Sequence, residues 1–167
     1  MFKHSIFVFI FIFFWVSPST QAQDLCSVQE TVVFSFQGMN SKKWMSLCKE
    51  SDSKYLVYRF GTKKNIELQY PAELDGNSWK KFDFAGRRRG GGKANAGFGD
   101  YSLSFTNGKA EYVVFQEWSD EDDTYSIGIN IQGDKKSITL LGNPKTQKGS
   151  LILLESENKN ISNTLAE

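Results

Sequence analysis

The side chains that most often carry out catalysis are scarce in this sequence. Its one histidine, His4, lies in an apolar N-terminal segment, and its two cysteines are Cys26 and Cys48. Removal of that segment leaves no imidazole, which excludes a Ser–His–Asp triad, a Cys–His pair and a histidine-ligated zinc site. Carboxylate, lysine and tyrosine chemistry remain. We predict no catalytic residue, no metal and no cofactor.

Paired carboxylates are the main catalytic constellation left to consider. A glycosidase needs two of them across a cleft. Glu111 and Glu117, six residues apart, would face the same side of a strand, and Glu67 and Asp83 could join them. Charged residues that alternate along the solvent face of a sheet are the ordinary case. A carboxylate-based hydrolase is therefore kept only as an alternative.

Two clusters of opposite charge, with one tryptophan between them, are the candidate contact residues. They are Arg87, Arg88, Arg89, Trp118, Asp120, Glu121, Asp122 and Asp123. The acidic run lacks the spacing and the glycine of the helical calcium loop. A solvated turn, a calcium site and an acidic finger for a basic partner all stay open.

The arginines lie in a glycine-rich stretch and are either an exposed basic loop or a contact for an acidic protein, a phosphate or a polysaccharide. Trp44, Trp79 and Trp118 could form a platform on which sugars stack. Packing in a core is the commoner fate of aromatic residues at strand spacing. Both interpretations of the tryptophans stay open.

Residues 1–22 have the features of a signal peptide. Lys3 stands near the start, an apolar run extends from Ile6 to Val16, and Thr20 and Ala22 are small. Such a run is too short for a spanning helix of roughly 20 residues. We predict cleavage after Ala22, a periplasmic or secreted protein, and no transmembrane anchor in the mature chain.

The mature chain is close to electrically neutral. Loss of Lys3 leaves 19 basic residues against 19 acidic ones. A nucleic-acid-binding protein usually has a basic excess, so we expect no nucleic-acid partner. The even number of cysteines in an exported chain predicts a disulfide between Cys26 and Cys48. Its loop-closure entropy contributes roughly 3 kcal/mol to stability.

The fold is predicted from the segment that must position these groups, Tyr101 to Gln132. Apolar residues alternate with serine, glycine and asparagine over Tyr101–Phe105 and Tyr125–Ile131, which is typical of half-buried strands. Asn107 and Gly108 supply a tight hairpin turn before a further strand, Glu111–Trp118. We predict an all-β fold, in which an antiparallel meander closes into a small barrel or a two-sheet sandwich.

Other strands are expected on both sides of this meander. They cover residues 30–36, 43–48, 55–60, 66–70, 79–84, 137–141 and 151–155. The glycine-rich stretch 86–99 is predicted to be a long mobile loop or a strand edge that needs close backbone approach. A single β domain would span 23–155, and 156–167 would be a polar, frayed C-terminal tail.

The first half of the mature chain contains Cys26, Glu30-Thr31-x-x-Phe34-Ser35, Ser46-Leu47-Cys48 and Tyr58-Arg59-Phe60-Gly61. In these residues it resembles a group of small exported proteins of Gram-negative bacteria that lack an assigned activity. Such proteins typically have a cysteine in place of Phe36, apparently paired with another near the C-terminus. Both are absent here, so the resemblance implies that the Cys26–Cys48 bridge is the one retained. It implies a fold and a compartment but no chemistry.

The function that these observations favour is non-enzymatic binding. The chain would be an exported protein whose partner is another protein, and the concrete form is a periplasmic inhibitor or immunity protein against an envelope-lytic enzyme. The alternative is a module that binds a carbohydrate or another envelope ligand through an exposed tryptophan and the basic segment.

Overall fold

The computed structural model describes residues 24–157 and 161–163. The predicted signal peptide, residues 1–22, lies outside the described residues. No helix in the described part of the chain is long and apolar enough to cross a membrane.

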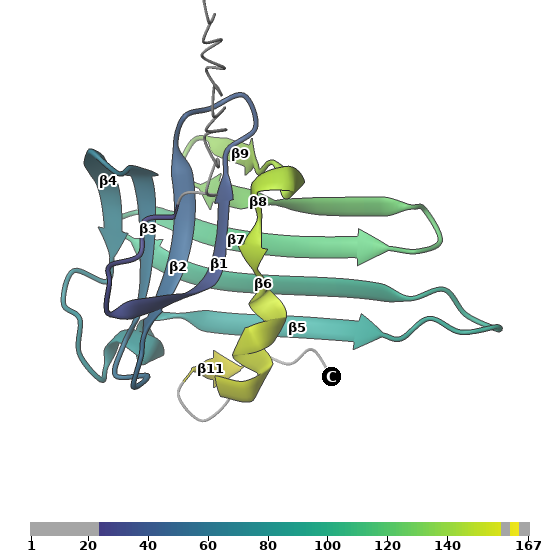
Figure 1. The fold of residues 1–167 in the computed structure, drawn as a ribbon. Helices are drawn as coiled ribbons and strands as arrows, with labels where there is room; N and C mark the ends of the chain where they lie inside the picture. The colour runs from purple at the N-terminus through teal and green to yellow at the C-terminus, as the bar shows by residue number, and fades with distance from the viewer. Residues whose placement is uncertain (1–23, 158–160, 164–167) are drawn as a thin grey trace, which may run out of the picture.

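Two β-sheets face each other (Figure 1). The five-stranded sheet has the order β10-β1-β2-β3-β4, with bounds Lys148–Gly149, Glu30–Gln37, Trp44–Glu50, Leu56–Thr62 and Asn65–Tyr70. The six-stranded sheet has the order β11-β5-β6-β7-β8-β9, with bounds Ser162–Asn163, Asp83–Arg89, Phe98–Asn107, Ala110–Ser119, Thr124–Gln132 and Ser137–Leu141. All neighbouring strands are antiparallel except β11 and β5. The all-β prediction is confirmed, and of its two forms the structure has the sandwich.

The predicted meander is the centre of the six-stranded sheet. Leu103 on β6 lies opposite Val114 on β7, which lies opposite Ile129 on β8, and all three side chains are buried. Ser102 and Ser104, between the buried residues of β6, stay partly exposed on the other face. The alternation predicted from the sequence therefore separates the residues that face the core from those that face the solvent.

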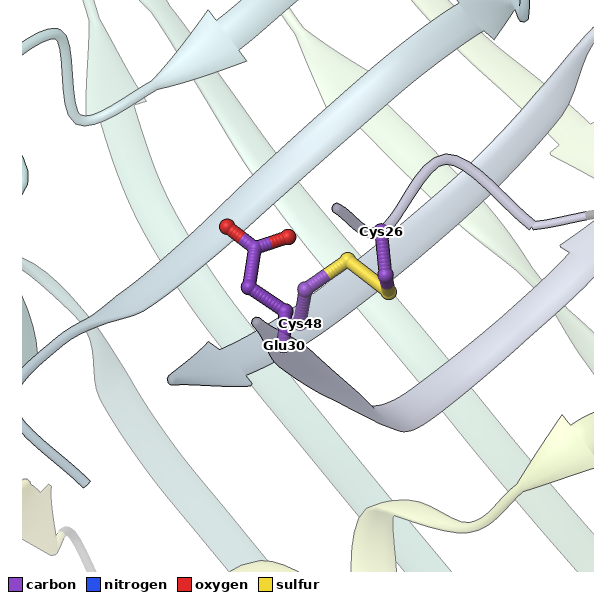
Figure 2. Close-up of side chains that lie close together, drawn as sticks. All are labelled: Cys26, Glu30 and Cys48. Atoms are coloured by element: carbon purple, nitrogen blue, oxygen red, sulfur yellow. A yellow bond between two sulfur atoms is a disulfide. The ribbon is translucent and has the colours of Figure 1, made fainter. Parts of the chain in front are cut away.

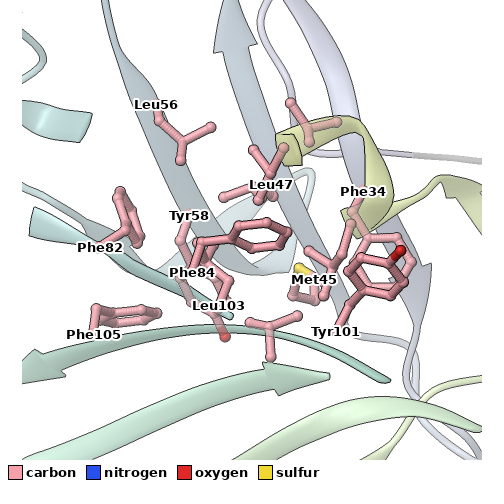
Figure 3. Close-up of a cluster of buried hydrophobic side chains, with 14 of the residues drawn as sticks. Phe34, Met45, Leu47, Leu56, Tyr58, Phe82, Phe84, Tyr101, Leu103 and Phe105 are labelled. Carbon is pink, nitrogen blue, oxygen red and sulfur yellow. The ribbon is translucent and has the colours of Figure 1, made fainter. Parts of the chain in front are cut away.

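The core lies between the sheets and is rich in aromatic rings (Figure 3). Phe105 is its hub at one end: its ring stacks on Tyr70 at 4.3 Å and on Tyr112 at 5.0 Å between centroids. Phe34 and Met45, from the five-stranded sheet, are fully buried in the same cluster, away from Phe105 (Figure 3). Stacked pairs of this kind stabilise a core beyond their buried area by roughly 0.5–1.5 kcal/mol each.

In the described part of the chain, three short 3₁₀ helices lie outside the sheets: η1 (Ser78–Lys81), η2 (Pro144–Thr146) and η3 (Leu151–Glu157). The prediction of a strand over 151–155 is wrong, because this segment belongs to η3. Leu151 and Leu154 are buried, while Leu153 is exposed, which is the spacing of a three-residue helical turn. The predicted strand at 79–84 is partly wrong for the same reason: Trp79 lies in η1, and β5 begins at Asp83.

The glycine-rich stretch is strand at both ends and loop in the middle. Residues 86–89 continue β5, and Phe98 and Gly99 begin β6, so only 90–97 form a loop. The interpretation as one long mobile loop is wrong for these positions, and the strand-edge alternative fits them. A Cβ at Gly86 would collide with the ring of Tyr101, and one at Gly99 with the ring of Trp118. Both glycines are needed because an aromatic ring lies flat on the neighbouring backbone.

The domain extends past residue 155. Glu157 ends η3, Ile161 is 5% exposed and packs in the core, and Ser162–Asn163 pair in parallel with Asp83 and Phe84. Part of the segment predicted as a frayed tail is thus packed on the domain. Residues 158–160 and 164–167 lie outside the described part.

Candidate functional site

All the predicted contact residues lie at one end of the six-stranded sheet. The long strands β5 to β8 continue there beyond the five-stranded sheet (Figure 1). Arg88 lies opposite Gly99, Gly99 opposite Trp118, and Trp118 opposite Tyr125. The acidic run 120–123 is the turn between β7 and β8. We call this part, residues 87–100 and 117–126, the overhanging end.

Two backbone contacts hold the glycine-rich loop to the acidic turn. The amide of Gly97 donates to Asp120 Oδ2 at 3.1 Å, and the amide of Asp120 donates to the carbonyl of Gly97 at 2.9 Å. A Cβ at Gly97 would collide with the Asp120 carboxylate. The basic strand end and the acidic turn are therefore fixed side by side, which the sequence alone does not reveal.

The four acidic residues of the turn have different roles. Asp120 is bound to Gly97, and Asp122 accepts a hydrogen bond from Ser119 Oγ at 2.9 Å. Among the described residues, neither Glu121 nor Asp123 has a hydrogen-bond or ion-pair partner, and both are exposed. No three carboxylates of this end bring oxygens within 4.8 Å of one another in the described part of the chain. The turn presents two unpaired negative charges to solvent.

The three arginines divide between the two faces of β5. Arg87 and Arg89 project from the outer face, where their guanidinium carbons lie 5.8 and 5.2 Å from the ring centroid of Phe98. Arg87 also pairs with Asp100 at 3.2 Å. These are cation–π contacts at an exposed site, each contributing about 0.5–1 kcal/mol. They order two long side chains that would otherwise be free.

Arg88 projects from the inner face, where it pairs with Glu155 of η3 at 3.2 Å. The other carboxylate oxygen of Glu155 accepts a hydrogen bond from the Tyr101 hydroxyl at 2.7 Å. Burial raises the pKa of Tyr101 to about 12, and this hydrogen bond adds to the effect. The contact fixes η3 against the root of the overhanging end.

Trp118 also lies on the inner face. Its ring stacks on Tyr101 with centroids 5.7 Å apart and planes 16° from parallel, and it is half-buried. Trp44 and Trp79 are 7% and 2% exposed. The interpretation of the three tryptophans as a sugar-stacking platform is therefore wrong, because two of them are core residues. Trp118 is the one that lies at a surface.

The outer face of the overhanging end contains a shallow depression of about 430 Å³. It is lined by Phe98, Gly99, Asp100, Glu117, Trp118, Ser119, Thr124 and Ser126. Asp100 and Glu117 lie directly opposite each other across β6 and β7. Phe98 and Asp100 were not among the predicted contact residues, although the alternation of β6 extends back to them.

The carboxylates predicted for a hydrolase do not lie across a cleft. Glu111 and Glu117 share one exposed face of β7, and six residues of strand separate them by ~20 Å. Glycosidases need a separation of roughly 5–10 Å. Glu67 lies in the other sheet and pairs with Lys43 at 2.7 Å. Glu111 and Glu117 share one face of the sheet, as predicted, but the distance between them is too long for a glycosidase.

Cys26, Glu30 and Cys48 form the one cluster of potential metal ligands in the described residues (Figure 2). The two sulfur atoms are bonded to each other, which confirms the predicted disulfide. Glu30 accepts hydrogen bonds from Arg59, Tyr55 and the amide of Ser27. Each member of the cluster already has a structural partner, and the group ties the N-terminal segment to the sheet.

We compared the chain with protein-family models, with curated proteins and with solved structures, and none of them matches it. The resemblance to small exported proteins of Gram-negative bacteria therefore stays a prediction.

Proposed function

We propose that this chain is a non-enzymatic exported binding protein whose overhanging end contacts another protein. In its concrete form it is a periplasmic inhibitor or immunity protein that guards the cell envelope against a lytic enzyme. The observation that carries this proposal is the tie between Gly97 and Asp120, which fixes a basic strand end and an acidic turn as one surface.

The chemistry of this surface is suited to a protein partner. Arginine and aromatic residues are enriched at the centres of protein interfaces, and Arg87, Arg89 and Phe98 form such a group. Asp100 on β6 and Glu117 on β7 border it, so two carboxylates lie beside the arginines of β5 on the same face of the sheet. Charges arranged in this way orient a charged partner and speed its association more than they add affinity.

The acidic turn indicates what kind of surface it contacts on the partner. Glu121 and Asp123 are exposed and unpaired at the tip of the β7–β8 hairpin, which extends with the β5–β6 hairpin beyond the five-stranded sheet (Figure 1). Such a projection can enter a cleft, and its charge favours a cleft lined by basic residues. A lysozyme-like enzyme with a basic substrate cleft is the class of target that we propose.

The disulfide supports an exported location. Bonds of this kind persist in oxidising compartments such as the periplasm and are rare in the cytosol. Together with the predicted signal peptide, this supports placement in the bacterial envelope, where lytic enzymes act.

A carbohydrate partner is the alternative. The depression of about 430 Å³ beside Phe98 contains hydroxyl groups and two carboxylates, which are groups that can hydrogen-bond a sugar. Guanidinium groups occupy the ring of Phe98, which leaves less of it for stacking. This observation makes the protein partner the better supported of the two.

Isothermal titration of the purified mature protein separates these proposals. The titrants are a panel of lysozyme-type and other peptidoglycan-cleaving enzymes, soluble peptidoglycan fragments and neutral polysaccharides. We expect saturable one-to-one binding to a lytic enzyme, weakened as the salt concentration rises, and loss of that enzyme's activity in the complex. Binding to the polysaccharides alone would contradict the proposal and favour the carbohydrate-binding alternative.

A further inference from the structure

A second hollow lies outside the overhanging end, at the edge of the sandwich beside the β1–β2 turn. This cleft has a volume of about 270 Å³ and is lined by Phe36, Gly38, Met39, Asn40, Ser41, Phe60, Ile129, Thr139, Leu140 and Leu141. Beneath the cleft the structure is apolar: Phe36 and Ile129 are buried there, at 1% and 0% exposure. At the rim, Met39 is 49% and Leu141 46% exposed, so apolar surface continues out to the opening.

The walls of the cleft are joined by backbone contacts between the two sheets. Gly38 forms a β-bridge with Gly142, and the amide of Met39 donates to the carbonyl of Leu141 at 2.7 Å. Gln37 Nε2 donates to the carbonyl of Ser41 at 2.7 Å and braces the turn from behind. The cleft is therefore part of the folded structure and does not depend on a loose side chain.

One positive charge stands at this apolar opening. The ammonium of Lys43 lies 5.7 Å from the ring centroid of Phe60, a lining residue, and its side chain is 44% exposed. Its charged neighbour is Glu67, at 2.7 Å. An exposed pair of this kind is weak, and an ammonium has three donors, so Lys43 can also bind a second anion.

We propose that this cleft binds a medium-chain fatty acid, with the alkyl chain on Met39, Phe60 and Leu141 and the carboxylate at Lys43. Its volume lies below the roughly 300 Å³ at which pockets for drug-sized ligands begin, so it accepts one narrow chain and not a bulky ring system. The exposed apolar side chains favour an alkyl group, and the two remaining donors of the Lys43 ammonium favour an anionic end. This site is independent of the proposed protein contact, because it shares no residue with the overhanging end.

Titration of the mature protein with octanoate and decanoate tests this inference. We expect saturable binding in which the longer chain binds about tenfold or more tightly, since each buried methylene strengthens affinity about fourfold. Decyltrimethylammonium, which has the same chain and a positive end, should bind at least tenfold more weakly than decanoate. Absence of saturable decanoate binding, or equal binding of the two amphiphiles, would overturn the proposal.

Two variants locate the binding. Leu141→Asp places a charge at the exposed rim without altering the core and should abolish decanoate binding, whereas the equally exposed Leu153→Asp, on η3, should leave it unchanged. Lys43→Gln should weaken decanoate but not decanol. Retention of binding in Leu141→Asp would contradict the site.

Sedimentation of the wild type without ligand tests whether a second copy of the chain covers the cleft. A dimer that Leu141→Asp dissociates would overturn the proposal, because the second copy and not a fatty acid would occupy the cleft.

Discussion

Arg59 and Glu30 form a two-pronged ion pair on the outer face of the five-stranded sheet. Arg59 Nη1 lies 2.6 Å from Glu30 Oε2, and Nη2 lies 2.9 Å from Oε1. The Glu30 side chain is fully buried and that of Arg59 is 10% exposed. Arg59 also donates to Gln69 and to the carbonyl of Leu25, so the pair anchors the segment that precedes β1.

Replacement of Glu30 by glutamine should lower the free energy of unfolding at neutral pH by about 3 kcal/mol. The reason is that Arg59 would remain buried without its counter-charge. Chemical denaturation of the wild type and of Glu30→Gln measures the difference. Asp134→Asn, which breaks the exposed pair with Lys109, is the matched control and should change stability by less than about 1 kcal/mol. An equal loss of unfolding free energy in the two variants would show that the buried pair contributes no more to stability than the exposed one.

The same pair predicts a dependence on pH. Burial raises the pKa of Glu30, but the hydrogen bonds from Arg59, Ser27 and Tyr55 and the charge of Arg59 outweigh it and leave the pKa below the usual 4.5. A lowered pKa means that the stabilisation is present above pH 4.5 and is lost as the pH falls through the pKa of the folded state. The gap in stability between the wild type and Glu30→Gln should therefore narrow in acid. A gap that stays constant down to strongly acidic pH would contradict this account.

Reduction of the disulfide should destabilise the same region. Cys26 and Cys48 are 22 residues apart, and a loop of this length contributes roughly 3 kcal/mol through loop closure. The double variant Cys26→Ser/Cys48→Ser, or the wild type with a reductant, should unfold at correspondingly lower denaturant concentration. If the two variants Glu30→Gln and Cys26→Ser/Cys48→Ser are combined, their effects should be less than additive, because both tie the same segment to the sheet. Strict additivity would count against a shared role.

The alternation of residues was enough to predict the meander, because each of its strands has one dry and one wet face. It was not enough for Leu151 to Leu154, where four consecutive apolar residues fit a buried strand and a short helix equally well. Nor could it show that Arg59 is buried. A cation inside a strand is expected on the solvent face, and only the return of residues 24–29 across the sheet covers it.

The sequence predicted which residues belong to the candidate site but not which of them contact one another. Arg87, Trp118 and Asp120 were each singled out by type, and the register of β5 to β8 brings them to one end. The glycines between them predicted either a mobile loop or a strand edge with close backbone approach. Gly97 and Gly99 make such close contacts, with Asp120 and Trp118. A contact between residues 23 positions apart has no signature in local composition.

Gly99 should tolerate no side chain. A methyl group there would collide with the ring of Trp118, so Gly99→Ala should cost about 1–3 kcal/mol and move Trp118 off Tyr101. A red shift of tryptophan fluorescence would report the displacement. Gly90→Ala is the matched control, because nothing lies within 4 Å of a Cβ at that position. A Gly99→Ala protein with unchanged stability and fluorescence would contradict the packing described for Trp118.

Tyr101 should ionise at a higher pH than an ordinary tyrosine, and its pKa should depend on Glu155. Burial raises the pKa of Tyr101 to about 12, and the hydrogen bond and negative charge of Glu155 add to it. A raised pKa means that the stabilisation is complete below pH 10, the usual value, and is lost as the pH rises through 12. In Glu155→Gln, spectrophotometric titration should show this tyrosine ionising at lower pH, with Glu117→Gln as the exposed control. An unchanged titration curve would mean that Glu155 does not contact the hydroxyl in solution.

The central claim, that the chain acts by surface contact through its overhanging end, is tested most directly by the affinity of two matched variants for the lytic enzyme that the wild type binds. Glu121→Gln/Asp123→Asn removes the two unpaired charges of the acidic turn, and Glu111→Gln/Asp134→Asn removes two charges at the other end of the same sheet. We predict that the first weakens binding about tenfold, corresponding to roughly 1.4 kcal/mol, and that the second leaves it unchanged. Equal affinities for that enzyme in both variants and the wild type would contradict the claim.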